Sequence, residues 1–373
     1  MKNIFAASLF SLVLVGTGCS TEPQATTRST SSAPVPSVSS SPITPTPVPI
    51  VESAPAKAKI VFGADFAKGT GCSTHNSEGC DIYSAEIAMD GSVSAVKQLT
   101  TEDRVEAFPV FSADGTMMYT NRFKQAAIGD IEYVSLVDGK TGILQADALS
   151  PAPMPDGKTI GYINANGLNV MLGTFATPMS LVGAEALTTD GNYHETHASQ
   201  SGNLIMSKLF GAGRGSNTAQ AKAFNVTTRT MIDLTESDGT AHCFWNWDGS
   251  GAMCNNSEKY RGIFVIPFDG VTAGAGKTFV TPIAVKKMIA INSDFAACLN
   301  VNYAYGTFCD ENHMIVTAGC ETETPTGRDT LMSQLVLIDF STSPQTVLPL
   351  GKNLSDSFGG PGIASHTVSC MME

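Results

Sequence analysis

The sequence is poor in charge, and in positive charge above all. Lysine and arginine make up 22 of its 373 residues against 34 aspartates and glutamates, which leaves a formal net charge of −12. No run of basic residues occurs anywhere in the chain. Because nucleic-acid binding needs clustered positive charge, the sequence argues against a nucleic-acid partner.

The short motifs of common enzyme classes are also missing. The chain contains no G-x-S-x-G nucleophile elbow, no P-loop and no dinucleotide-binding fingerprint. No long segment shows the 3.6-residue periodicity of a helix, and turn residues punctuate the whole sequence. The missing motifs argue against an enzyme without deciding the question. The missing helical periodicity favours an all-β fold.

Long apolar runs are absent except at the N-terminus. The run from Ile4 to Val15 is shorter than the roughly 20 residues of a membrane-spanning helix, so residues 1–18 are predicted to be a secretory signal peptide. The small residues before Cys19 resemble the bacterial lipoprotein box, although Gly16 stands where that box usually has leucine. The resemblance implies a lipid anchor on Cys19, export to the cell envelope and, in a Gram-negative cell, the outer membrane. An ordinary signal peptide would instead leave Cys19 as a free thiol.

Residues 19–57 after this signal are almost all serine, threonine, proline, alanine and valine. Such a stretch cannot bury a core, so it is predicted to be a disordered tether. As a flexible coil it would span roughly 35 Å, and as extended polyproline about 120 Å. It would hold a folded, monomeric head of residues 58–373 away from a membrane.

Eight cysteines follow Cys19, an even number that indicates four disulfides in an exported protein. No C-x2-C pair is present, which disfavours zinc. Residues 241–254 align with residues 296–309, and each segment carries two cysteines eleven residues apart around a glycine-containing turn. We therefore predict the pairs Cys243–Cys254 and Cys298–Cys309 across hairpins, Cys72–Cys80 by proximity, and Cys320–Cys370 from the remainder.

An internal repeat organises the head. Turn markers recur with glycines 42, 45 and 47 residues apart: Ser112-Ala113-Asp114-Gly115, Pro155-Asp156-Gly157, Gln200-Ser201-Gly202 and Trp247-Asp248-Gly249. Each marker precedes a short apolar strand, two further strands of this type occur, and each of the six is followed by a second strand. A period in the mid-forties predicts a six-bladed β-propeller, with seven blades as the alternative from length alone.

The ends of the head provide a test of closure. The first repeat lacks the strand that should precede Ile60–Phe66, and Gly362–Cys370 forms a strand with no unit after it. Pairing the two would close the ring and remove two exposed sheet edges.

Several units carry Leu-Thr, then a polar stretch, then a proline- or serine-containing strand and Asp-Gly. Gln98–Tyr119 is the best example, and this pattern resembles the TolB-like propeller repeat. The resemblance implies the fold over 58–373 and little about function. TolB proteins carry an additional N-terminal α/β domain, whereas a tether stands in that place here. Related repeats also occur in peptidases and polysaccharide lyases.

Four residues form the candidate ligand-binding set: Glu106, His194, His197 and His242. Glu106 and His242 follow their Leu-Thr pairs by a similar distance to His194, and propellers place equivalent residues of successive blades around one channel. The set could therefore bind a polar ligand or a divalent metal at the channel mouth, or it could only satisfy backbone groups there. Trp245 and Trp247 alternate on one predicted strand, and blade packing is the expected role for both.

The predicted function is that of an envelope lipoprotein whose propeller binds a protein or glycan without catalysis. No cofactor is predicted. The alternative is a metal-dependent, polysaccharide-active lyase or hydrolase that uses the histidines of the candidate set.

Overall fold

The computed structural model describes most of one compact unit, Ser53–Glu373. The signal peptide, Cys19 and nearly all of the tether lie outside the described residues. No helix long and apolar enough to cross a membrane occurs within the part described. The described residues are 56–65, 80–101, 106–125, 128–209, 219–234, 242–255, 263–267, 300–324, 327–342, 346–350, 354 and 363–373.

Six antiparallel sheets form the blades of a propeller, five with four strands and one with three described strands. The prediction of an all-β, six-bladed propeller is therefore confirmed. The strands of each blade are given from the inner strand outward. Blade 1 consists of β23 (Ile363–Met372), β1 (Lys57–Asp65), β2 (Asp81–Ala88) and β3 (Val93–Gln98), and blade 2 of β4 (Glu106–Phe111), β5 (Met117–Gln125), β6 (Ile128–Ser135) and β7 (Thr141–Gln145). Blade 3 consists of β8 (Ala148–Pro153), β9 (Thr159–Asn164), β10 (Val170–Thr177) and β11 (Ser180–Ala186), and blade 4 of β12 (Tyr193–Ala198), β13 (Asn203–Leu209), β14 (Ala219–Asn225) and β15 (Thr230–Asp233). Blade 5 consists of β16 (His242–Trp245), β17 (Gly251–Asn255) and β18 (Ile263–Pro267), and blade 6 of β19 (Asn300–Phe308), β20 (His313–Thr324), β21 (Gly327–Asp339) and β22 (Thr346–Pro349).

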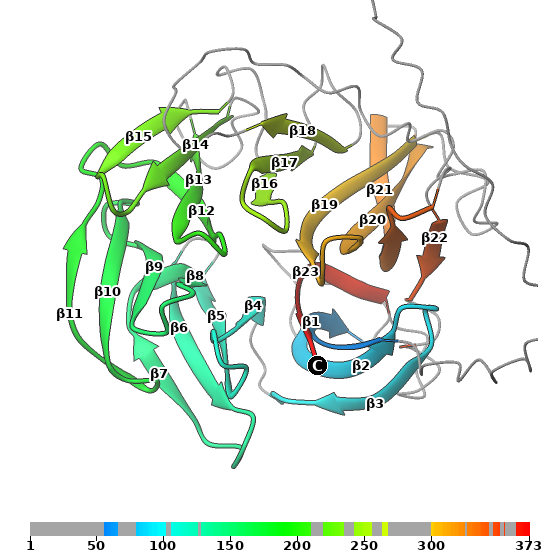
Figure 1. Ribbon diagram of the computed structural model, residues 1–373, viewed down its shortest axis with the longest axis horizontal. Coiled ribbons are helices and arrows are strands. Elements are labelled where there is room, and N and C mark those ends of the chain that lie inside the picture. Colours follow the sequence, from blue (N-terminus) through cyan, green and yellow to red (C-terminus); the bar gives the residue numbers. More distant parts are fainter. Residues whose placement is uncertain are drawn as a thin grey trace, which may run out of the picture. The chain divides into compact units, whose positions relative to one another are not determined.

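The blades are arranged as a ring, with β23, β4, β8, β12, β16 and β19 nearest its centre (Figure 1). The inner strands of blades 2 to 6 each run into the second strand of their sheet through a short turn, and we call the end of the propeller that carries these turns the turn end. The four glycines of the repeat marker all occupy it with positive φ, between 64° and 79°. Residues other than glycine rarely adopt this left-handed backbone conformation, which explains why glycine recurs at the period of the blades.

The Leu-Thr pairs have a structural role at the outer strands. In blade 1 the hydroxyl of Thr100 accepts a hydrogen bond from the amide of Ile82 at 2.8 Å, and in blade 3 Thr188 does the same for Val170 at 2.9 Å. Both threonines are buried. The hydroxyl thus satisfies a backbone donor where a blade ends, which is why the pair recurs.

The ring is closed by the two ends of the unit, as the sequence predicts. β23 pairs antiparallel with β1, and Cys370 lies opposite Ile60 and Val368 opposite Phe62. The last strand of the chain is thus the inner strand of the first blade. Closure removes the two edges that would otherwise be free to pair with another chain.

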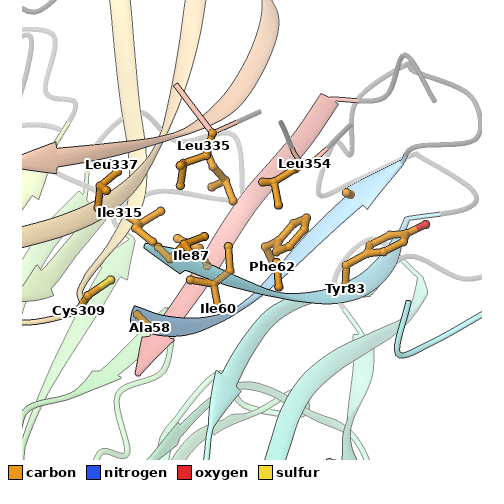
Figure 2. Packing of buried hydrophobic residues seen from close by; sticks show 14 residues of the cluster. Ala58, Ile60, Phe62, Tyr83, Ile87, Cys309, Ile315, Leu335, Leu337 and Leu354 are labelled. Carbon is orange, nitrogen blue, oxygen red and sulfur yellow. The ribbon is translucent and has the colours of Figure 1, made fainter. Parts of the chain in front are cut away.

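An apolar core fills the junction of the first and last blades (Figure 2). Side chains of β1 and β2 interlock there with side chains of β20 and β21, all less than a tenth exposed. Burial of this surface stabilises the closed ring, since each fully buried aliphatic side chain contributes about 1.5–3 kcal/mol. The labelled members are Ala58, Ile60, Phe62, Tyr83, Ile87, Cys309, Ile315, Leu335, Leu337 and Leu354.

The disulfide within blade 5 is present as predicted. Cys243 and Cys254 face each other across the β16–β17 hairpin and are bonded. Cys80 is also disulfide-bonded. Because Cys72 lies outside the described residues, the Cys72–Cys80 pairing stays a prediction.

The pairing predicted for Cys309 and Cys370 is wrong. These two cysteines bond to each other, so neither Cys298–Cys309 nor Cys320–Cys370 forms. The hairpin expected around Cys309 is one continuous strand, β19, and Cys309 directly follows its end. The closing strand brings Cys370 beside that position, and the bond joins blade 6 to blade 1. Cys298 lies outside the described residues.

Candidate functional site

The inner strands enclose a cavity on the axis of the propeller. It has a volume of about 140 Å³, and all six inner strands contribute to its wall. We call it the central cavity. Its lining residues are Phe108, Pro109, Val110, Ser150, Pro151, Ala152, Pro153, Thr196, His197, Ala198, Phe244, Trp245, Gly306, Thr307, Val368 and Ser369.

Buried hydrogen bonds fix the wall of this cavity. Ser150 has a φ of 55°, and its amide donates to Oδ1 of Asn121 at 2.8 Å. Its hydroxyl accepts from the amide of Thr196 at 2.9 Å, and the hydroxyl of Thr196 donates to the Ser150 carbonyl. Neighbouring blades are therefore joined at the cavity by bonds that water cannot reach, which makes the wall rigid.

A second cavity of about 240 Å³ continues the first toward the turn end. The two share lining residues from all six blades, such as Val110, Pro153, Ala198 and Thr307. We call it the mouth cavity. It is lined by Val110, Phe111, Ser112, Ala113, Pro153, Pro155, Ala198, Ser199, Gln200, Trp245, Asn246, Trp247, Thr307, Phe308, Ser369, Cys370 and Met371.

The two tryptophans have different environments, contrary to the prediction. Trp245 is 6% exposed and its indole N–H donates to the carbonyl of His197 at 3.1 Å. Trp247 is 38% exposed, because β16 ends at Trp245 and Trp247 lies in the turn that follows. Trp245 packs between blades as expected, whereas Trp247 presents an aromatic surface at the mouth cavity.

The candidate ligand-binding set is distributed over several environments. His197 lines the central cavity. Glu106 is buried at the start of β4, and Nε2 of His194 lies 3.3 Å from Oε1 of the buried Glu195. His242 begins β16, and its side chain lies outside what the structure describes. Over the described residues, no three histidine, cysteine, aspartate or glutamate side chains form a group that could hold a metal ion.

Glu106 has an unusual environment for a carboxyl group. It is 1% exposed, and neither carboxyl oxygen has a hydrogen-bond partner among the described residues. Burial above all, against an opposing effect of the Thr100 hydroxyl and with smaller contributions from the carboxylates of Glu132 and Asp81, raises its pKa to about 8. Burial raises the pKa of Glu132 as well. The Glu106 carboxyl group is therefore mostly protonated and uncharged at neutral pH.

Counting residues from the Leu-Thr pair fails to identify the cavity wall. The inner strands contain irregular register shifts between these pairs and the turns, as between Ala107 and Val110. Counting back from the turn glycine avoids them, since the residue five positions before each marker glycine lines the central cavity. These residues are Val110, Ala152, His197 and Phe244.

Solved structures share this architecture. TolB from Acinetobacter baumannii aligns with a TM-score of 0.51 at 11% identity over 85% of this chain, which spans 66% of that protein. A TolB-type protein from Agrobacterium tumefaciens aligns with a TM-score of 0.49 at 12% identity, over 86% of this chain and 99% of that one. A puromycin-hydrolysing peptidase of Mycobacterium tuberculosis aligns with a TM-score of 0.42 at 13% identity, over 74% and 44%.

At these identities the likeness shows the fold, which is that of a TolB-like β-propeller. No family model matches the sequence. No curated protein matches it either.

Proposed function

We propose that this chain is an exported, lipid-anchored binding protein of the cell envelope. Its propeller holds a protein or glycan partner at the mouth of the central channel and carries out no chemistry of its own. The observation that carries the proposal is the pair of connected cavities on the propeller axis, which end at the exposed Trp247.

The wall of these cavities suits binding. Prolines and aromatic side chains from several blades lose little conformational freedom when a partner is bound, and aromatic rings offer large contact areas. The cavities measure about 140 and 240 Å³. Each alone is smaller than the roughly 300–1,000 Å³ of sites that enclose a whole small molecule, and the two meet as one channel. A partner that inserts a few side chains or sugar rings fits these dimensions better.

The N-terminal region supports the proposed location. A lipid on Cys19 would fix the chain to a membrane, and the tether of residues 19–57 would let the propeller reach partners up to about 120 Å away. An oxidising compartment agrees with the disulfides of blades 5 and 6.

The alternative of a metal-dependent, polysaccharide-active enzyme has weaker support. It required Glu106, His194, His197 and His242 to surround one point. Glu106 is instead buried away from the lining of either axial cavity, and His194 contacts Glu195. No observation among the described residues favours this function over binding.

Photo-crosslinking in living cells tests the proposal. A photoreactive amino acid replaces Trp247 in the full chain, and in a control it replaces Val182, which is 71% exposed on the outer strand β11. We expect a discrete adduct with one envelope protein or glycan from position 247 and none from position 182. Equal labelling from both positions, or no adduct from position 247, would refute the proposed binding surface.

A further inference from the structure

A third cavity extends the mouth cavity outward between blades 2 and 3. It has a volume of about 280 Å³ and shares Ser112, Ala113, Pro153 and Pro155 with the mouth cavity. We call it the interblade groove. Its lining residues are Ser112, Ala113, Asp114, Tyr119, Pro153, Met154, Pro155, Asp156, Gly157, Phe175 and Pro178.

The groove is held in shape by contacts between the two blades. The hydroxyl of Tyr119 in blade 2 donates to the carbonyl of Pro178 in blade 3 at 2.8 Å. The rings of Tyr119 and Phe175 stack with centroids 5.7 Å apart. Because these contacts are made within the chain itself, binding in the groove would cost little reorganisation.

Two exposed carboxylates line this apolar groove, one from each blade. Oδ1 of Asp114 accepts hydrogen bonds from the hydroxyls of Ser112 and Thr116 and from the Thr116 amide. Asp156 accepts bonds from the amides of Lys158 and Thr159 in the equivalent turn. The turns thus fix both carboxylates. Asp114 and Asp156 are the charged residues among the described lining residues of the groove. Lys158 does not belong to the lining.

We propose that the interblade groove binds an extended peptide segment of the partner through a lysine or arginine side chain. This inference rests on the proposed function and selects a protein partner over a glycan. The apolar wall covers the aliphatic stem of such a side chain while its charged head pairs with Asp114 and Asp156. A neutral sugar would donate hydrogen bonds to these carboxylates but would bring no counter-charge, whereas a lysine or arginine supplies both. The net charge of −12 also attracts a cationic partner.

Fluorescence anisotropy with the purified full chain tests this inference. The probes are two labelled hexapeptides, one of alternating proline and lysine and one of alternating proline and glutamine. The test variant is Asp114→Asn with Asp156→Asn, and asparagine keeps the acceptor that each turn uses. The matched control is Asp90→Asn with Asp138→Asn, which changes the net charge equally at exposed turns of blades 1 and 2.

We expect the lysine peptide to bind about tenfold more weakly to the test variant, since two partly screened charge pairs are lost. The control should bind within about twofold of the parent, as expected for a distant charge change. Similar weakening in both variants would show that the peptide responds to the net negative charge of the protein and not to the groove. Equal binding of the glutamine peptide would show that charge is not recognised. Either result overturns the inference.

The crosslinking experiment separates this inference from the proposed function. An adduct from position 247 together with failure of the peptide test leaves the binding function standing and removes the groove. Selective loss of peptide binding in the test variant without any adduct from position 247 leaves the groove standing and removes the proposed function.

Discussion

The disulfide between Cys309 and Cys370 should stabilise the propeller more than the disulfide within blade 5. It joins the end of β19 in blade 6 to the closing strand β23 in blade 1, whereas Cys243–Cys254 joins two strands of one hairpin. Both bonds are shielded from solvent to a large extent, because Cys243, Cys254 and Cys309 are buried and Cys370 is half-buried. Replacing each pair by alanine therefore compares closure of the ring with closure of a hairpin.

The difference follows from the lengths of the two loops. The bonded cysteines are 61 residues apart in one case and 11 in the other. Constraint of the unfolded chain gives about 4.3 kcal/mol of stability for the longer loop and about 2.8 kcal/mol for the shorter. Loss of the closing bond should thus lower the free energy of unfolding by about 1.5 kcal/mol more than loss of the hairpin bond.

Equilibrium urea unfolding without reductant measures both losses. Hydrogen exchange gives a second measurement, since freeing β23 should accelerate exchange of the amides that pair β23 with β1 and leave blade 5 unchanged. Equal losses in the two variants, together with unchanged exchange in β23, would refute the reasoning. Peptide mapping of the oxidised parent should recover Cys309 and Cys370 in one cross-linked fragment.

Three further predictions concern single residues. The folded-state pKa of about 8 at Glu106 exceeds its ordinary 4.5, so stability that is present at acidic pH is lost as the pH rises toward 8. Glu106→Gln should therefore flatten the pH profile of urea unfolding and gain roughly 3 kcal/mol at neutral pH; an unchanged profile would contradict this burial effect. Thr188→Val removes the acceptor of the Val170 amide and should cost about 1–2 kcal/mol in the same assay, whereas the exposed Thr174→Val should cost less than about 0.5 kcal/mol. Cys19→Ala should abolish incorporation of a clickable fatty acid, and persistent labelling would place the lipid elsewhere.

Much of the architecture could be predicted because local rules repeat in every blade. The strand expected at Ile60–Phe66 overlaps β1, and the strand expected at Gly362–Cys370 overlaps β23. Glycines with positive φ fix where four of the inner strands end, and strand alternation fixes which face is buried. Closure was also predictable, since an unpaired strand at each end of a propeller needs the other.

The site and one disulfide were harder to predict from the sequence because they depend on three-dimensional proximity between distant segments. Cys309 and Cys370 meet only after the ring closes, and nothing within either segment marks the other. Glu106 could be expected in the channel only while the inner strands were treated as regular. The register shift after Ala107 breaks that regularity, and Glu106 is buried between strands instead.

Closure and binding are linked by the position of the closing strand. Ser369, Cys370 and Met371 of β23 line the mouth cavity, and the hydroxyl of Ser369 accepts a hydrogen bond from the amide of Phe111 in β4. A partner seated in the mouth cavity would therefore contact the strand whose pairing closes the ring. Because a ligand that binds only the closed form stabilises that form, partner binding should suppress local opening of β23. By the same coupling, the free energy by which a mutation favours opening should appear as a loss of binding free energy. The Cys309–Cys370 bond would then serve the site as well as the fold, since it keeps one wall of the mouth cavity in place before any partner arrives.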